Sequence, residues 1–145
     1  MKKTLLLPIL ATALLFSSCD RAPFPLRLAH FDVRWFDDDE SGTRTPGDYL
    51  QFAMRVVTTA PDPDDQFITD WEFAYYVNGA FGGTLQSDRN LRSNSITLDA
   101  GITIKNLSLP RPGPLKPGDV IEFQFWAKDN WGEHEERRYR YVLEP

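Results

Sequence analysis

The feature that most constrains the fold is a two-residue alternation of apolar and polar side chains. Between residues 120 and 128, one face of the predicted strand carries the apolar residues Ile121, Phe123, Phe125 and Ala127. A period of two places one set of side chains on each face of a β-strand, whereas a helix requires a period of 3.6. The same alternation occurs over residues 29–35, 50–56 and 71–77. No segment has a convincing helical period, so the sequence predicts an all-β fold.

Turn signals separate the alternating stretches. Asn78-Gly79 directly follows the third stretch and is a strong hairpin signal, because both residues tolerate a positive φ. The other expected elements are a return strand over 80–85 loosened by Gly82-Gly83, a loop over 86–94, two short strands or one bent strand over 96–104, an irregular proline-rich connection over 109–118, and a closing strand over 133–143.

The count of seven or eight strands suits a two-sheet antiparallel sandwich. Nineteen aromatic residues, 11 prolines and 9 glycines also favour strands and turns over a helix bundle. The stretch 115–132 resembles the last hairpin of immunoglobulin-like or fibronectin type III-like domains, and Trp71 falls on the third strand, where such folds often bury a tryptophan. The resemblance implies an immunoglobulin-like sandwich over residues 26–145, without the inter-sheet cysteine pair, and it implies no particular activity.

The N-terminus combines a basic start, Met1-Lys2-Lys3, with an apolar run over residues 5–16. Twelve residues are too few to cross a hydrocarbon core, which needs about 20. Small residues and Cys19 follow, and this arrangement resembles a bacterial lipoprotein signal peptide with its lipobox. The resemblance implies cleavage after residue 18, attachment of acyl chains such as palmitate to Cys19, and a tether over 19–25. The alternative is an ordinary secretory signal cleaved nearby, which leaves Cys19 discarded or as a free thiol.

The net charge and the residues next to Cys19 indicate where in the cell the protein is expected and which partners are excluded. Removal of residues 1–18 leaves 14 basic and 21 acidic residues, a net charge of about −7. This charge argues against binding to nucleic acid and to anionic lipid headgroups. Asp20 after the cysteine resembles the inner-membrane retention signal of enteric bacteria. The leader ending Phe-Ser-Ser-Cys-Asp is similar to those of Bacteroidota, for which the expectation is lipid anchoring in the cell envelope at the outer membrane.

The acidic stretch 37–48 is the sharpest motif for a bound ligand. Oxygen-bearing side chains fall at alternate positions, with a glycine at position 6 and an acid at position 12, in the order Asp37, Asp39, Ser41, Thr43 and Asp48. This spacing lets alternate oxygens converge on one hard cation, while Gly42 makes the sharp turn. The stretch is therefore a candidate calcium site, and the competing interpretation is a solvated acidic loop between two strands.

Aromatic side chains near turns suggest a second kind of ligand. Trp131 lies at a predicted hairpin tip, and Tyr76 and Phe81 flank the Asn78-Gly79 turn. Flat aromatic faces of this kind can bind sugar rings, so a carbohydrate-binding module is the alternative function. The competing interpretation is that Trp131 packs over one end of the sandwich.

Catalytic signals are weak. The two histidines, His30 and His134, have no metal-ligand spacing, and there is no Gly-x-Ser-x-Gly elbow. We therefore expect a non-enzymatic lipoprotein that binds or scaffolds an unidentified envelope partner, either a protein or a glycan. The alternating Arg and Glu residues of 133–140 are expected to form cross-strand ion pairs or, alternatively, to dock a partner at a sheet edge.

Overall fold

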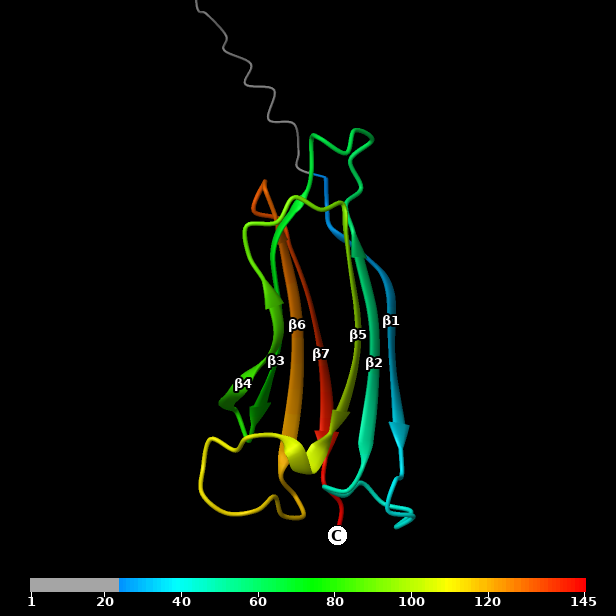
Figure 1. Ribbon diagram of the computed structural model, residues 1–145, viewed down its shortest axis with the longest axis vertical. Helices are drawn as coiled ribbons and strands as arrows, with labels where there is room; N and C mark the ends of the chain where they lie inside the picture. Colours follow the sequence, from blue (N-terminus) through cyan, green and yellow to red (C-terminus); the bar gives the residue numbers. More distant parts are fainter. Residues whose placement is uncertain (1–23) are drawn as a thin grey trace, which may run out of the picture.

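The computed structural model describes residues 24–145, so the expected leader over 1–18 and Cys19 lie outside the described residues. The described chain forms two packed antiparallel sheets (Figure 1). One sheet has the order β1-β2-β5 and the other the order β4-β3-β6-β7. The strand bounds are Arg27–Phe36 for β1, Tyr49–Val57 for β2, Ile68–Val77 for β3, Ala80–Asp88 for β4, Ser95–Thr103 for β5, Val120–Asp129 for β6 and His134–Val142 for β7. The prediction of an immunoglobulin-like two-sheet sandwich is confirmed, with seven strands in the described residues.

The fourth strand determines which variant of the sandwich this is. In the constant-type immunoglobulin arrangement the fourth strand lies beside the fifth, in the other sheet from the third. Here β4 pairs with β3 through the Asn78-Gly79 hairpin, where both residues have positive φ, 51° and 82°. The predicted hairpin is confirmed, and its short turn keeps β3 and β4 in one sheet.

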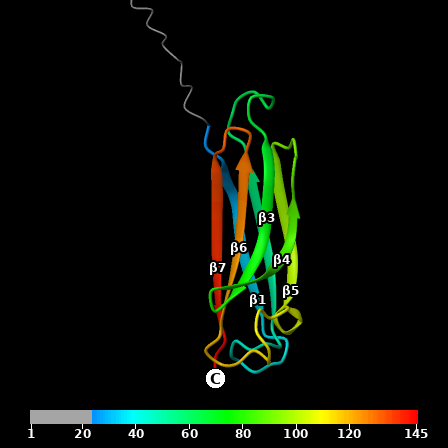
Figure 2. The same cartoon turned by 90° about the vertical axis from the view of Figure 1, so that its left-hand side faces the viewer.

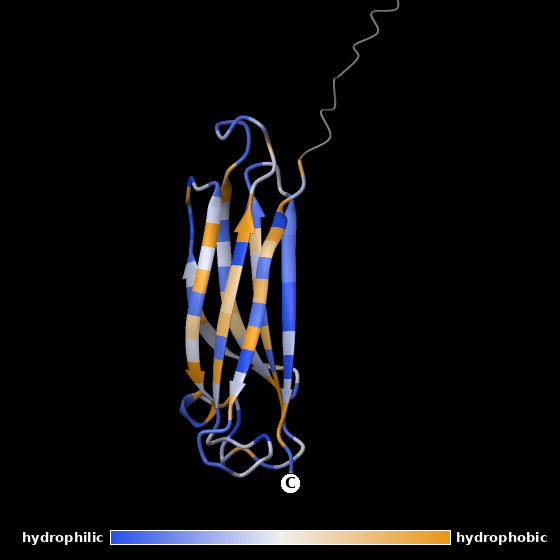
Figure 3. Ribbon diagram, turned by 90° about the vertical axis from the view of Figure 1, so that its right-hand side faces the viewer, coloured by the Kyte–Doolittle hydropathy of each residue, from blue (hydrophilic) through white to orange (hydrophobic). Residues whose placement is uncertain are grey.

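The core lies between the sheets and follows the predicted alternation. Figure 3 shows polar and apolar bands alternating along the strands. The inward side chains of β6 are all at most 1% exposed, and they are Ile121, Phe123, Phe125 and Ala127. Phe52 of β2 joins the two sheets, because its ring lies 5.0 Å from that of Phe73 and 4.9 Å from that of Phe123. Aromatic pairs at these centroid distances add attraction beyond the area they bury.

The first strand departs from the predicted alternation at one residue. Val33 and Trp35 lie opposite Phe52 and Leu50 of β2, on the inward face as expected. A register shift between Leu28 and His30 places Leu28 opposite Val56 and leaves Ala29 exposed. The inward position expected for Ala29 is therefore wrong, because a bulge inserts one extra residue and reverses the faces.

The bounds of β4 and β5 differ from those expected, and both strands contain glycines that pack against tyrosine side chains. The return strand β4 continues to Asp88, where an end at residue 85 was expected, and β5 is one continuous strand followed by the 3₁₀ turn Ile104–Asn106. A Cβ at Gly82 would lie 2.2 Å from the Tyr75 ring, and one at Gly101 would lie 1.9 Å from the Tyr49 hydroxyl. These glycines make room for tyrosine side chains on the neighbouring strands, so they shape the sheets without ending them.

The sandwich has two distinct ends (Figure 2). At the entry end, the carbonyls of Phe24 and Pro25 accept hydrogen bonds from Gln66 and Thr59 of the β2–β3 loop. The first described residues, Phe24 and Pro25, are therefore hydrogen-bonded to the rest of the domain. The far end carries the β1–β2 loop, the β3–β4 turn and the proline-rich connection. Among residues 24–145, no helix is long and apolar enough to cross a bilayer.

Candidate functional site

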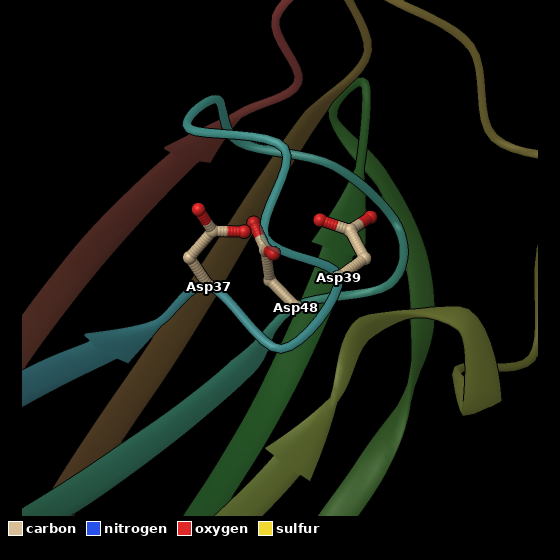
Figure 4. A group of neighbouring side chains, drawn as sticks. All are labelled: Asp37, Asp39 and Asp48. Atoms are coloured by element: carbon tan, nitrogen blue, oxygen red, sulfur yellow. The ribbon is translucent and has the colours of Figure 1, made fainter.

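The β1–β2 loop gathers three carboxylates at the far end. One ligand oxygen from each of Asp37, Asp39 and Asp48 lies within 4.8 Å of the others (Figure 4). Asp37 directly follows β1 and Asp48 directly precedes β2, and the strand ends are paired at Phe36 and Tyr49. The antiparallel pairing therefore brings the first and last residues of the loop together. We call these three residues the acidic triad.

Two members of the triad are held by the backbone of their own loop. Asp37 accepts hydrogen bonds from the N–H groups of Ser41, at 3.0 Å, and Gly42, at 2.7 Å. Asp39 accepts from the same Ser41 N–H and from the Thr45 hydroxyl, at 2.5 Å. The Thr45 hydroxyl is the main reason that the pKa of Asp39 lies below its usual value, followed by the hydrogen bonds from Ser41. The carboxylate form of Asp39 is therefore favoured.

Asp48 is the buried member, with no exposed surface. Its Oδ2 accepts three hydrogen bonds, from the Trp35 indole at 2.8 Å, from the Thr45 N–H at 2.8 Å and from the Tyr141 hydroxyl. Its Oδ1 is also buried, and no donor in the described part of the chain contacts it. Burial, reinforced by the hydrogen bond and the charge of Asp48, raises the pKa of Tyr141 far above its usual value, so Tyr141 stays a hydrogen-bond donor.

The predicted ligands Ser41 and Thr43 lie in the same loop, but their hydroxyls face each other. The Ser41 hydroxyl donates to the Thr43 carbonyl at 2.9 Å, and the two hydroxyl oxygens are 3.5 Å apart. Gly42 has a φ of +74°, which fits its predicted role at the sharp turn. The loop therefore uses Ser41 chiefly to position the carboxylates of Asp37 and Asp39.

Sequence reasoning missed the residues that surround Asp48. Tyr141 lies 93 residues further along the chain, on β7, and Trp35 lies on β1. Gly47 was also missed as a packing residue, and a Cβ there would lie 2.6 Å from Asp39 Oδ2. The alternation of Tyr139 and Tyr141 in the closing strand was the available signal. It does not indicate which end of the sandwich either ring reaches.

Beside the triad, β1 forms an exposed aromatic edge. This strand has one hydrogen-bonded neighbour, β2, and so lies at the edge of its sheet. Phe31, Trp35 and Phe36 are 37%, 38% and 45% exposed, and we call them the β1 edge. One of the two edge strands of the other sheet, β7, is different, because its exposed side chains form ion pairs such as Arg137–Glu135 and Arg138–Glu136. Charged edges resist pairing with other strands, whereas apolar edges favour it.

The predicted sugar-binding aromatics divide between the two ends. Tyr76 and Phe81 lie together near the β3–β4 turn, with ring centroids 5.6 Å apart, and Phe81 is 55% exposed. Tyr76 also lines a groove of about 580 Å³ on the outer face of β3, β6 and β7, whose other lining residues are Asn78, Gly79, Val120, Glu122, Gln124, Arg138 and Arg140. Trp131 lies at the entry end, where its indole donates to the Asp65 carbonyl at 2.6 Å. It therefore does not share a surface with the other two.

The two histidines lie on different strands, and charged side chains of β7 form ion pairs. His30 lies on β1 and His134 on β7, in different sheets, and His134 stacks on Trp126 with ring centroids 5.9 Å apart. Arg138 bridges to Glu122 across the β6–β7 pair at 3.0 Å, which confirms the expected cross-strand ion pairing.

Comparison with known proteins gives little further information. No protein-family model matches the chain, and no curated protein matches its sequence. A crystal structure of the ApaA protein from Bordetella pertussis aligns over 84% of this chain and 94% of that chain, with 12% sequence identity and a TM-score of 0.38. The alignment is too loose to carry an argument about function.

Proposed function

We propose that this protein is a non-enzymatic lipoprotein of the bacterial cell envelope, that it is anchored at Cys19, and that it docks an envelope protein through the β1 edge. The observation that carries the proposal is the set of three exposed aromatic rings on an edge strand that pairs with β2 on one side and with no strand of the described residues on the other. Phe31 and Trp35 lie on one face of β1 and Phe36 on the other, so exposed aromatic side chains occur on both faces of this edge strand. Exposed apolar surface commonly marks interaction sites. The free side of an edge strand can also accept a strand from a partner.

The position of the anchor supports this arrangement. Phe24 and Pro25 join the domain at the entry end, a few residues after Cys19. A lipid on Cys19 would hold that end at the membrane and direct the far end away from it. Trp35 and Phe36 lie at the far end of β1, next to the β1–β2 loop. They would therefore meet a partner away from the lipid surface.

Site-specific photo-crosslinking in cells tests the docking surface. A photoreactive phenylalanine analogue replaces Phe31 or Phe36 and, as the matched control, Thr97 on the opposite edge strand β5, which is exposed and polar. The proposal predicts the same discrete cross-linked protein from positions 31 and 36 and none from position 97. Equal cross-linking from all three positions, or none from any, would contradict it.

Replacement of the cysteine tests the anchor separately. Cys19→Ser removes the lipid attachment site without changing the described domain, and the variant is expected to leave the membrane fraction. A variant that still sediments with membranes would show that the lipid anchor is wrong. The cross-linking result does not depend on this outcome, so the two parts of the proposal can fail independently.

The groove beside Tyr76 favours carbohydrate binding as a second candidate. A half-buried tyrosine next to amide and guanidinium groups is suited to stacking on a sugar ring and to hydrogen bonding with its hydroxyls. Tyr76→Ala and Phe81→Ala should then abolish glycan-array binding, whereas Trp131→Ala, at the other end, should not. An array without binding by the unaltered protein would remove this candidate.

A further inference from the structure

Two aspartates are buried within residues 24–145, Asp48 and Asp129, and they differ in how many of their carboxylate oxygens accept hydrogen bonds. Asp129 at the β6–β7 hairpin uses both oxygens, since Oδ1 accepts from the N–H groups of Trp131 and Glu133 and Oδ2 accepts from the Gln66 amide. Asp48 is equally buried, but only its Oδ2 is supplied with donors. Burying a carboxylate oxygen without a donor is costly, because it has lost its water and gained no partner.

The surroundings of Asp48 increase this cost. Figure 4 shows its carboxylate pointing between those of Asp37 and Asp39. Among the described residues, none of the three forms an ion pair with Lys, Arg or His, although eight such contacts occur elsewhere in the domain. Three close carboxylates with no cation repel one another. A cation at this point would supply both the missing partner of Oδ1 and the missing positive charge.

We propose that the acidic triad of Asp37, Asp39 and Asp48 binds one calcium ion. The ligand oxygens lie within 4.8 Å of one another, and two ligands on opposite sides of a calcium ion are separated by about twice its bond length of roughly 2.4 Å. The three oxygens can therefore occupy a single coordination sphere. Calcium accepts six to eight oxygens in irregular geometry, so loop carbonyls and water complete the shell. Magnesium requires a near-ideal octahedron, which an irregular loop fits less well.

The groups that orient the carboxylate of Asp48 are already in place. The Trp35 indole, the Thr45 N–H and the Tyr141 hydroxyl fix Asp48 Oδ2, so the orientation of the carboxylate is set before any ion arrives. Gly47 gives Asp39 the space to lie against the backbone. The proposal goes beyond the docking function, because the site requires no partner protein. Trp35 belongs to the β1 edge and also donates a hydrogen bond to Asp48, so calcium would also stiffen the edge where it meets the loop.

Thermal unfolding of the purified protein tests the proposal. At a dissociation constant of about 10⁻⁴–10⁻³ M, typical of extracellular calcium modules, 5 mM calcium chloride should raise Tm by about 3–10 °C over EDTA. Isothermal titration should show one ion per chain. Magnesium chloride at 5 mM, and sodium chloride at equal ionic strength, should raise Tm by much less. No rise with calcium, or an equal rise with magnesium, would overturn the proposal.

Matched variants separate a built site from general attraction to acidic residues. Asp48→Asn keeps the size of the side chain and should abolish the calcium-dependent rise. Asp38→Asn removes the same charge from an exposed neighbour that is not part of the triad, and should keep most of the rise. Equal losses in the two variants would show diffuse attraction and overturn the site. Asp37→Asn, at a more accessible position, gives the same test if Asp48→Asn does not fold.

Discussion

Two turns of this sandwich are built alike, and they treat their aspartates differently. Asp48 and Asp119 each end a Pro-Gly-Asp sequence and each precede a strand, β2 and β6. In both turns the aspartate Oδ2 accepts from the N–H three residues earlier, Thr45 or Lys116, at 2.8 Å. The aspartate N–H also donates to the carbonyl of that same residue, at 3.3 Å and 3.0 Å. The two turns therefore share the same pair of hydrogen bonds, although their backbones differ at the glycine, because Gly118 has a positive φ and Gly47 does not.

The difference lies in what surrounds the carboxylate. Asp119 forms an ion pair with Arg111, and its Oδ1 accepts from the Asn78 amide at 2.8 Å. Asp48 has no such cation in the described chain, and its Oδ1 has no donor. The turn at Asp119 is thus complete within the protein, whereas the turn at Asp48 leaves one oxygen available to an external cation. The comparison shows that the same pair of hydrogen bonds can hold an aspartate whose two oxygens both have donors and an aspartate with one oxygen left without a donor.

The largest expected effect is a difference in the free energy of unfolding between Asp119→Asn and Asp48→Asn, measured without calcium. Asp119→Asn should lower the free energy of unfolding by about 2 kcal/mol, because it removes the charge that Arg111 and the hydrogen bonds stabilise. Asp48→Asn should change it by less than about 0.5 kcal/mol in EDTA, because it also removes the repulsion within the triad. Urea unfolding in EDTA measures both values. Equal losses would show that the two turns are equivalent.

Next in size is the effect of a donor to Asp48. Tyr141→Phe removes the hydroxyl that donates to Oδ2 and should cost about 1–2 kcal/mol in EDTA, since a buried carboxylate loses one of three hydrogen bonds. Tyr139→Phe is the control on the same strand, because the Tyr139 hydroxyl has no hydrogen bond within residues 24–145. A loss no greater for Tyr141→Phe than for this control would contradict the described environment of Asp48.

The glycines of the two turns should respond in different ways, each by about 1 kcal/mol or less. Gly118 has a φ of +85°, so Gly118→Ala should cost about 1 kcal/mol with or without calcium. Gly47→Ala meets no such strain, but its Cβ would lie 2.6 Å from Asp39 Oδ2 and would displace that carboxylate. The expected result is a reduced calcium-dependent rise in Tm, and an unchanged rise would exclude Asp39 as a ligand.

The smallest expected effect is a pH dependence at Asp119. The Asn78 amide, the Lys116 N–H and Arg111 hold the pKa of this carboxyl below its usual value. A lowered pKa in the folded state gives stability that is fully present above the unfolded value of about 3.9 and is lost as pH falls through the folded value. The difference between the unaltered protein and Asp119→Asn should therefore be constant above about pH 5 and shrink below about pH 4. A difference that grows on acidification would reverse the assignment.

The sequence predicts the fold well where local pattern decides the outcome. The alternation in β6 identifies four core side chains, and Asn78-Gly79 identifies the hairpin, because both signals act over a few residues. The bulge at Ala29 escapes prediction because a small apolar residue satisfies the alternation on either face. The close approach of the Tyr49 side chain to Gly101 of β5 also escapes prediction, because Tyr49 lies on the neighbouring strand β2.

The candidate site likewise has some features that the local sequence predicts and others that depend on tertiary packing. The spacing of Asp37, Asp39 and Asp48 is visible in the sequence, and the structure brings these carboxylates together. Their burial and donors are not visible, because Tyr141 reaches Asp48 only after the closing strand has crossed the sandwich. The spacing therefore predicts which residues meet, and tertiary packing determines which oxygen remains free.

The most direct test of the central claim is a crystal structure grown with calcium chloride and measured for anomalous scattering. The predicted result is one anomalous peak about 2.3–2.6 Å from Asp48 Oδ1 and from an oxygen of both Asp37 and Asp39. A well-ordered loop with no such peak, and with Asp48 Oδ1 bonded to water or to a protein donor, would contradict it.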